Sequence, residues 1–173
     1  MLAPAMNQTR LLFGAVFVLC AGLMGFAFFL EHVKNLEPCP LCLFQRLFFI
    51  AIGAVALVAA LHGPGATGRR VYAALLAVLT VGGGGVATRH VWLQHLPADK
   101  VPECGPGLEY MLEAFPVMEM LQEVLGGSGE CAEVSWRFLG LSIPEWTLIV
   151  FSGLLAFFLW MVFRRRLPGE APA

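Results

Sequence analysis

Hydrophobic residues are gathered along this chain into four long stretches, separated by shorter polar segments. The first stretch, residues 11–30, carries no charge and gives a helix of about 30 Å at ~1.5 Å per residue, enough to cross a bilayer core. The second needs residues 43–46 in front of its apolar run to reach across. We therefore expect four membrane-spanning helices, over about residues 11–30, 43–61, 71–89 and 145–163.

The composition also indicates a membrane protein. Hydrophobic residues make up 58% of the chain and charged residues 13%, whereas soluble domains carry about 25% charged residues. The predicted fold class is all-α: an integral membrane four-helix bundle in a single domain over residues 1–173. Loops are expected over about 31–42 and 90–144 at one end of the bundle and 62–70 at the other.

Two local patterns add detail to this bundle. In the long loop, apolar residues recur at helical spacing between 117 and 125, with acidic and amide side chains on the other face. This pattern predicts a short amphipathic helix, lying either on the membrane or over the bundle. In the third span, the four glycines 82–85 either allow close packing of a neighbouring helix or leave room for a flat ligand.

The first apolar stretch has a second interpretation as a cleaved signal peptide, because Arg10 precedes it. However, the stretch is longer than a typical signal core, and the aromatic run at residues 26–29 is a poor cleavage context. We therefore expect it to be a retained helix.

Charge predicts the orientation of the bundle. With four spans, both termini and the 62–70 loop lie on one side, which holds a single acidic residue, Glu170. The basic residues of that side are Arg10, Arg69, Arg70, Arg164, Arg165 and Arg166. The positive-inside rule makes this side cytoplasmic. The cysteines expected on the outer side, where disulfides persist, are Cys39, Cys42, Cys104 and Cys131.

The sequence Cys39-Pro-Leu-Cys42 is a Cys-x-x-Cys pair at the start of the second helix. Such a pair is either a static disulfide, half of a metal site or an exchange-active dithiol. A helix N-terminus favours the nucleophilic thiolate, and Cys42, nearer the helix, should benefit most. We interpret Cys39 and Cys42 as redox-active.

Two cationic or titratable residues are expected at about the same depth as each other, about one turn into the membrane from the dithiol. Arg46 follows Cys42 by four residues, so both side chains share one helix face. Arg46 either extends to the lipid headgroups or stabilises the Cys42 thiolate or a negatively charged reduced acceptor. His90, at the outer end of the third helix, is a candidate hydrogen-bond donor to a bound acceptor.

Cys104 and Cys131 are both in the long outer loop. They form either a disulfide that braces the loop or a second redox pair. Glycine-rich segments beside both residues favour exchange, because mobile, exposed disulfides are open to attack. Cys20 lies in the middle of the first span and is expected to be a small apolar residue without a redox role.

Several other chemistries lack support in the sequence. A zinc site needs more close Cys or His pairs than the one Cys-x-x-Cys supplies. There is no glycine-rich nucleotide motif after a strand, which argues against a bound flavin or nicotinamide. An exposed basic stripe is also missing, so nucleic acid is not an expected partner.

The motifs resemble the DsbB family of bacterial inner-membrane disulfide-formation proteins. The run from Cys39 to Arg46, Cys-Pro-Leu-Cys-Leu-Phe-Gln-Arg, is similar to the family's C-x-x-C-x-x-x-R. The run from Cys131 to Trp146 is similar to the family's signature leading into the last helix. The resemblance covers nearly the whole chain.

The resemblance implies a disulfide oxidase with two catalytic cysteine pairs. Cys104 and Cys131 would form the disulfide that oxidises a reduced DsbA-like thioredoxin-fold protein of the periplasm, with Cys104 making the mixed disulfide. Electrons would then pass by exchange to Cys39 and Cys42. The implied location is the inner membrane, with cytoplasmic termini and periplasmic cysteines.

The resemblance also implies a membrane quinone as the final acceptor, either ubiquinone, which we expect, or menaquinone. Cys42 would reduce this quinone, held beside Arg46 and near His90. No metal or flavin is expected. In the family the residue before the helix-two arginine is often acidic, and here it is Gln45, which speaks against an essential proton-accepting role at that position.

Two alternatives stay open. A thiol oxidoreductase of the vitamin K epoxide reductase type also has four helices, a Cys-x-x-Cys and loop cysteines, but there the loop pair precedes the Cys-x-x-Cys, whereas here it follows. The other alternative is a non-catalytic membrane scaffold whose outer cysteines form static disulfides.

Overall fold

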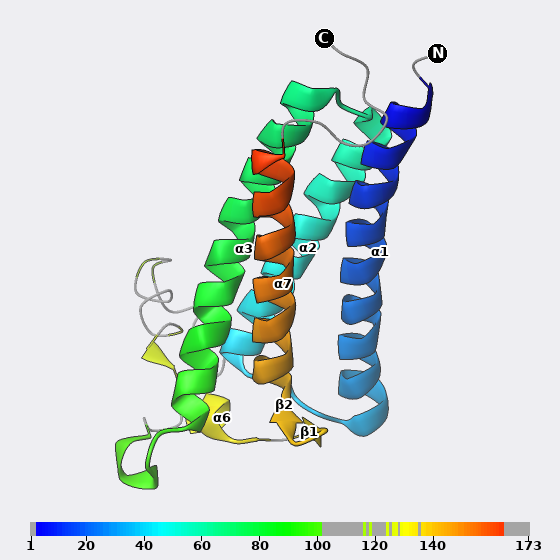
Figure 1. The fold of residues 1–173 in the computed structure, drawn as a ribbon. Helices are drawn as coiled ribbons and strands as arrows, with labels where there is room; N and C mark the ends of the chain where they lie inside the picture. Colours follow the sequence, from blue (N-terminus) through cyan, green and yellow to red (C-terminus); the bar gives the residue numbers. More distant parts are fainter. Residues whose placement is uncertain are drawn as a thin grey trace.

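A computed structural model of the protein describes residues 3–101, 116, 118, 124, 126, 127, 129–134 and 136–164. Within these ranges the chain forms a bundle of four long helices (Figure 1). They are α1 (Ala3–Lys34), α2 (Pro40–His62), α3 (Ala66–Gln94) and α7 (Ile143–Phe163). Each is long and apolar enough to cross a membrane. The predicted all-α, four-helix class is therefore confirmed.

The helices differ from the expected spans at their polar ends. α1 continues to Lys34, so residues 31–34, which we expected in a loop, are helical. It ends where Asn35 adopts a left-handed φ of 50°, a conformation that asparagine tolerates. α2 begins at Pro40 rather than near Cys42, because proline has the φ of a first helical turn and lacks an N–H that this turn leaves unbonded.

Arginines bind two helix ends at the end of the bundle where α2 turns into α3. Arg10 donates to the last carbonyls of α2 at 2.9 and 2.8 Å. Arg69, which is fully buried, donates to the carbonyls of Met161 and Arg164 at 2.6 and 3.2 Å. Carbonyls in a last helical turn lack partners within the helix and carry partial negative charge. The two guanidinium groups therefore tie α1 to α2 and α3 to α7.

The core of the bundle is built from aromatic rings packed against small residues. Phe49 of α2 and Phe151 of α7 stack with ring centroids 4.3 Å apart. The glycine run of α3 packs against Phe151 and the neighbouring Phe48. A Cβ atom at Gly83 would lie 2.5 Å from the ring of Phe151, and one at Gly82 would lie 2.7 Å from the ring of Phe48. At these two glycines the structure supports close helix packing.

A small β-hairpin, absent from our prediction, leads into α7. Strands β1 (Arg137–Phe138) and β2 (Leu141–Ser142) pair antiparallel. The two residues between them, Leu139 and Gly140, have φ of 52° and 83°, as in the two-residue turns that match the twist of paired strands. Two-residue strands are too short to produce an alternating pattern, which is why the sequence did not reveal them.

The remaining described elements lie at the dithiol end of the bundle (Figure 1). They are the short helix α6 (Gly129–Ala132) and the 3-10 helix η1 (Ala98–Lys100). Most of the amphipathic helix predicted between 117 and 125 falls outside the described residues, as does Cys104.

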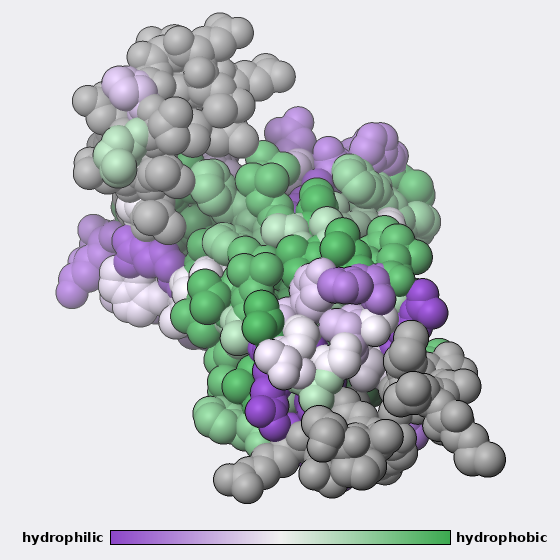
Figure 2. All heavy atoms as spheres, turned by 90° about the horizontal axis from the view of Figure 1, so that it is seen from above, coloured by the Kyte–Doolittle hydropathy of each residue, from purple (hydrophilic) through white to green (hydrophobic). Residues whose placement is uncertain are grey.

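The outside of the bundle is apolar. Large hydrophobic side chains such as Val78, Leu61 and Val71 are 70%, 67% and 64% exposed. Seen from above in Figure 2, hydrophobic residues cover much of the described surface and hydrophilic residues gather in smaller groups. Exposed apolar area of this extent suits lipid rather than water. The chain is a multi-pass membrane protein.

Candidate functional site

The dithiol lies at the start of α2. Cys39 directly precedes the first helical turn in an extended conformation, and its carbonyl accepts the N–H of Leu43 at 3.2 Å. The Cys39 thiol donates to the sulfur of Cys42 at 3.1 Å. The free N–H groups of a first helical turn favour negative charge on a sulfur placed there. The two sulfurs are therefore in contact at a position that favours a thiolate.

His90 of α3 reaches the dithiol from the side. Its Nε2 lies 3.7 Å from the sulfur of Cys39, and its Nδ1 lies 3.1 Å from the side-chain nitrogen of Gln45. Thr147 of α7 donates its hydroxyl to the amide oxygen of Gln45 at 2.6 Å. An amide N–H donated to Nδ1 leaves the ring proton on Nε2, facing the sulfur. A hydrogen-bonded chain from Thr147 of α7 through the buried Gln45 thus orients the imidazole toward Cys39.

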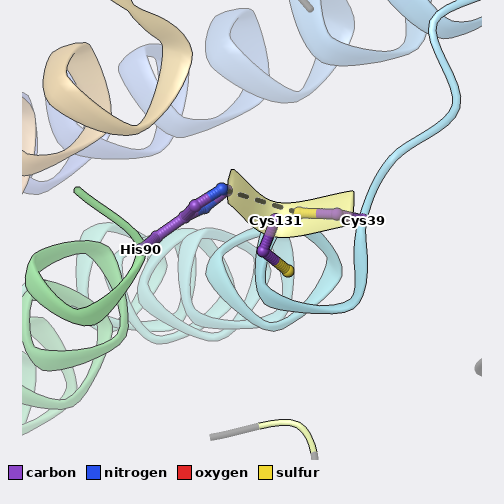
Figure 3. A group of neighbouring side chains, drawn as sticks. All are labelled: Cys39, His90 and Cys131. Carbon is purple, nitrogen blue, oxygen red and sulfur yellow. Dashed lines mark hydrogen bonds between the residues drawn. The ribbon is translucent and has the colours of Figure 1, made fainter. Parts of the chain in front are cut away.

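Cys131 of α6 completes the cluster drawn in Figure 3. Its sulfur, that of Cys39 and a ring nitrogen of His90 all lie within 4.8 Å of one another. All three side chains are buried, and they come from the N-cap of α2, from α3 and from α6. The structure therefore brings one loop cysteine to the helix dithiol, although the two are far apart in sequence.

Arg46 lies one turn below Cys42 and already has an anionic partner. It forms an ion pair with Glu31 of α1, and its guanidinium carbon lies 5.6 Å from the ring centre of Phe28. Its side chain is 17% exposed. Neither of the two predicted roles included this pairing. A ligand that binds to the Arg46 guanidinium therefore either displaces the Glu31 carboxylate or binds alongside it.

A cavity of about 1010 Å³ opens beside the dithiol, between α1, α2 and α7. Its walls are mostly apolar, with residues such as Leu23, Met24, Phe49 and Val150. The predicted site residues at its edge are Cys39, Cys42, Arg46 and His90. Apolar walls with a few convergent polar groups are typical of small-molecule sites of this size. The arrangement suits a flat, lipid-soluble molecule held next to a sulfur.

Several residues at this site were not predicted. Glu31 was assigned to a loop, and Thr147 was treated as part of an apolar span. A polar residue facing inward from a span is costly unless it has a partner, so Thr147 carried a signal that we did not use. Trp136 and Phe138, which stack at 5.8 Å in the cavity mouth, lie around a hairpin that the sequence did not reveal.

A dithiol at a helix start, beside a mostly apolar cavity in a four-helix membrane bundle, is the arrangement expected of a membrane thiol oxidoreductase. Comparison with known proteins narrows this class. The family model described as disulfide bond formation protein DsbB matches residues 9–161. The chain belongs to the DsbB family, which confirms the resemblance drawn from the motifs and makes the protein a disulfide-forming oxidoreductase.

Individual relatives agree along nearly their whole length. The chain is 58% identical to disulfide bond formation protein B of Hahella chejuensis over 162 residues, which cover 94% of this chain and 98% of that protein. It is 55% identical to the protein of the same name from Marinobacter nauticus, over 94% of this chain and 96% of that protein. These names indicate disulfide formation, and the roles of individual residues stay predictions.

Proposed function

We propose that this protein is a thiol:quinone oxidoreductase that reoxidises a DsbA-like thioredoxin-fold protein of the periplasm and passes the electrons to a membrane quinone. The observation that carries the proposal is the position of the dithiol. The sulfurs of Cys39 and Cys42, 3.1 Å apart, line the cavity of about 1010 Å³. The sulfur of Cys131 lies within 4.8 Å of that of Cys39. The Cys39–Cys42 pair thus lies next to both the sulfur of Cys131 and a cavity large enough for a ligand.

The sulfur chemistry proceeds by exchange. The reduced partner attacks a Cys104–Cys131 disulfide, forms a mixed disulfide with Cys104 and releases Cys131 as a thiolate. The partner's second thiol then displaces Cys104, so the partner leaves as a disulfide. The Cys131 thiolate attacks the Cys39–Cys42 disulfide at Cys39, releasing the Cys42 thiolate, and Cys104 re-forms its bond with Cys131. The electron pair and its protons now reside on Cys39 and Cys42.

The cavity supports a quinone as the final acceptor. Its walls are apolar, and Arg46 and His90 at its edge are the residues that would hold quinone oxygens. A bound quinone supplies an acceptor of two electrons and two protons that is soluble in lipid. Cys39 and Cys42 release two electrons and two protons as their disulfide re-forms. The Nε2–H of His90, 3.7 Å from the sulfur of Cys39, is placed to donate a hydrogen bond to the thiolate that forms there.

The proposed topology follows from charge. The end of the bundle that carries Arg10, Arg69 and Arg70 faces the cytoplasm of a bacterial inner membrane. The opposite end, with the dithiol and α6, then faces the periplasm, where its partner and its disulfides are found.

The test is an anaerobic assay of the purified protein with a reduced thioredoxin-fold partner and ubiquinone or menaquinone, followed by quinone absorbance. The variant Cys42→Ser removes the proposed electron donor and should abolish quinone reduction. The matched control Cys20→Ala removes a buried core thiol of α1 and should keep wild-type turnover. Near-normal turnover of Cys42→Ser would refute the proposed donor.

A second measurement separates the oxidase from a scaffold with static disulfides. In the oxidase, Cys131→Ser should trap a mixed disulfide between Cys104 and the partner, visible on a non-reducing gel. Failure of every single-cysteine variant to trap the partner, together with no quinone reduction by the wild type, would support the scaffold instead.

A further inference from the structure

Two buried cysteines and a buried histidine, which are common zinc ligands, lie together at the dithiol (Figure 3). The sulfurs of Cys39 and Cys131 and a ring nitrogen of His90 lie within 4.8 Å of one another. In a tetrahedral zinc site, Zn–S bonds of about 2.3 Å and Zn–N bonds of about 2.0 Å separate a sulfur from a nitrogen ligand by about 3.6 Å. The sulfur of Cys39 and Nε2 of His90 are 3.7 Å apart. The Cys39–His90 pair therefore has the ligand spacing that zinc requires, and Cys131 lies close enough to complete the set after a small adjustment.

We propose that the protein binds one Zn²⁺ ion at Cys39, His90 and Cys131 when its outer cysteines are reduced. The proposal rests on the proposed function, because both cysteines must pass through a thiol state. Binding releases the two thiol protons and transfers no electrons. The fourth ligand is a water molecule, as in zinc sites with three protein ligands.

Charge balance favours this ligand set. Two thiolates and one neutral imidazole cancel the charge of Zn²⁺. The cluster lies in a second apolar core that includes Leu41, Leu93 and Val124, and burying a net charge there would be costly. Adding a third thiolate from Cys42 would leave a negative charge, so Cys42 stays outside the site.

The partners of His90 can adapt to a metal. Ligation through Nε2 requires the ring proton to move to Nδ1. The amide of Gln45, 3.1 Å from Nδ1, can accept that proton's hydrogen bond by turning its oxygen toward the ring, and its nitrogen then donates to Thr147. Residues that orient a ligating histidine in this way typically contribute about 10–100-fold to metal affinity.

Zinc binding and disulfide exchange compete for the same sulfurs at this site. Coordination to zinc lowers the nucleophilicity of a thiolate toward a disulfide, and zinc is bound by thiolates rather than by disulfide sulfurs. Zinc should therefore hold the protein in its reduced form and inhibit turnover. The proposed role of the site is to make the oxidase sensitive to the zinc concentration outside the cytoplasm.

The experiment is a titration of the detergent-solubilised, fully reduced protein under argon, after removal of a phosphine reductant. Zn²⁺ is measured by competition with a chromophoric chelator, and Co²⁺ serves as a spectroscopic probe. We expect one ion per chain and the visible and thiolate charge-transfer bands of tetrahedral cobalt. Cys131→Ser and His90→Gln should each weaken zinc binding by at least about 100-fold. This limit is the largest effect typical of residues that only hydrogen-bond to a metal ligand, and loss of a ligand itself should cost at least as much. Cys20→Ala, which also removes one thiol, should bind as the wild type does.

Two further variants sharpen the result. Gln45→Leu should weaken zinc binding by about 10–100-fold. Cys42→Ser should bind zinc within a few-fold of the wild type although it reduces no quinone. Equal affinities of His90→Gln, Cys20→Ala and the wild type would overturn the site, because the metal would then be held by thiols alone. Loss of binding in Cys42→Ser would overturn the three-residue ligand set.

Turnover assays distinguish a failure of the proposed zinc site from a failure of the proposed oxidase function. Zinc should inhibit quinone reduction at the concentration at which it binds, and a chelator should restore the rate. A wild type that binds cobalt tetrahedrally but never reduces quinone would refute the proposed function and leave the metal site standing. A wild type that reduces quinone at full rate with zinc present, and shows no tetrahedral cobalt, would refute the metal site alone.

Discussion

The glycine run of α3 allows a controlled test of how the bundle packs. Gly83 is buried, and a Cβ there would lie 2.5 Å from two ring atoms of Phe151 and 3.0 Å from Cβ of Phe48. Gly85, two residues further along the same helix, is exposed, and a Cβ there meets no atom within 4 Å. The variants Gly83→Ala and Gly85→Ala therefore add the same methyl group to the same helix in opposite environments.

The expected magnitudes follow from two effects. Replacing glycine by alanine in a helix interior stabilises it by about 1 kcal/mol, and this gain is shared by both variants. Extra volume in a packed core costs about 1–3 kcal/mol, and only Gly83→Ala incurs it. The ring of Phe151 has little room to shift, because it is 1% exposed and stacks on Phe49. Gly83→Ala should thus be about 1–3 kcal/mol less stable than Gly85→Ala.

The assay is equilibrium unfolding of the detergent-solubilised proteins by added dodecyl sulfate, followed by tryptophan fluorescence and circular dichroism. The difference between the two midpoints isolates the steric cost, since the shared helix gain cancels. Phe49 also lines the cavity, so displaced rings should alter quinone KM in Gly83→Ala. Equal stability of the two variants, or a more stable Gly83→Ala, would refute close packing at this glycine.

Two further predictions concern arginines. Arg46→Ala removes the cation at the cavity edge and should raise the quinone KM. Glu31→Gln removes the carboxylate partner of Arg46 and should lower the quinone KM a few-fold. Steady-state kinetics measure both values, and a quinone KM that shifts equally and in the same direction in both variants would contradict the reasoning. Arg69→Leu removes two hydrogen bonds to carbonyls at the end of α7 and should lower the free energy of unfolding by about 1–3 kcal/mol. The neighbouring, exposed Arg70→Leu should lower it by less, and an equal loss would show that charge rather than carbonyl binding is responsible.

The four spans could be predicted because a bilayer leaves few alternatives. A long apolar stretch in lipid must satisfy its backbone hydrogen bonds internally, and a helix does so. The helix ends were harder to place, because hydropathy marks the bilayer core rather than the end of the helix. Polar residues continue α1 to Lys34, and Pro40 starts α2 before its apolar face begins.

The contacts within the candidate site were predictable from spacing only where its residues are close in sequence, although His90 was named from its expected depth in the third span. Cys39, Cys42 and Arg46 share one helix start, so spacing and helix geometry were enough. The approach of Cys131 to Cys39, and the chain from Thr147 through Gln45 to His90, depend on how separate helices pack. No local pattern encodes such contacts, and the one available signal was a polar residue within an apolar span.

The burial of the sulfurs argues for two cysteine pairs rather than one. Cys39 is 9% exposed and Cys131 is fully buried, so a protein partner cannot reach either sulfur in this arrangement. Cys42 is more accessible, but it faces a cavity with apolar walls. In the proposed function, a partner in water therefore delivers its electrons to a disulfide with another sulfur, and Cys104 is the remaining cysteine of the predicted outer loop. If Cys104 reacts with the partner and the Cys39–Cys42 pair reacts in the cavity, as proposed, the apolar walls of the cavity keep water away from the second reaction.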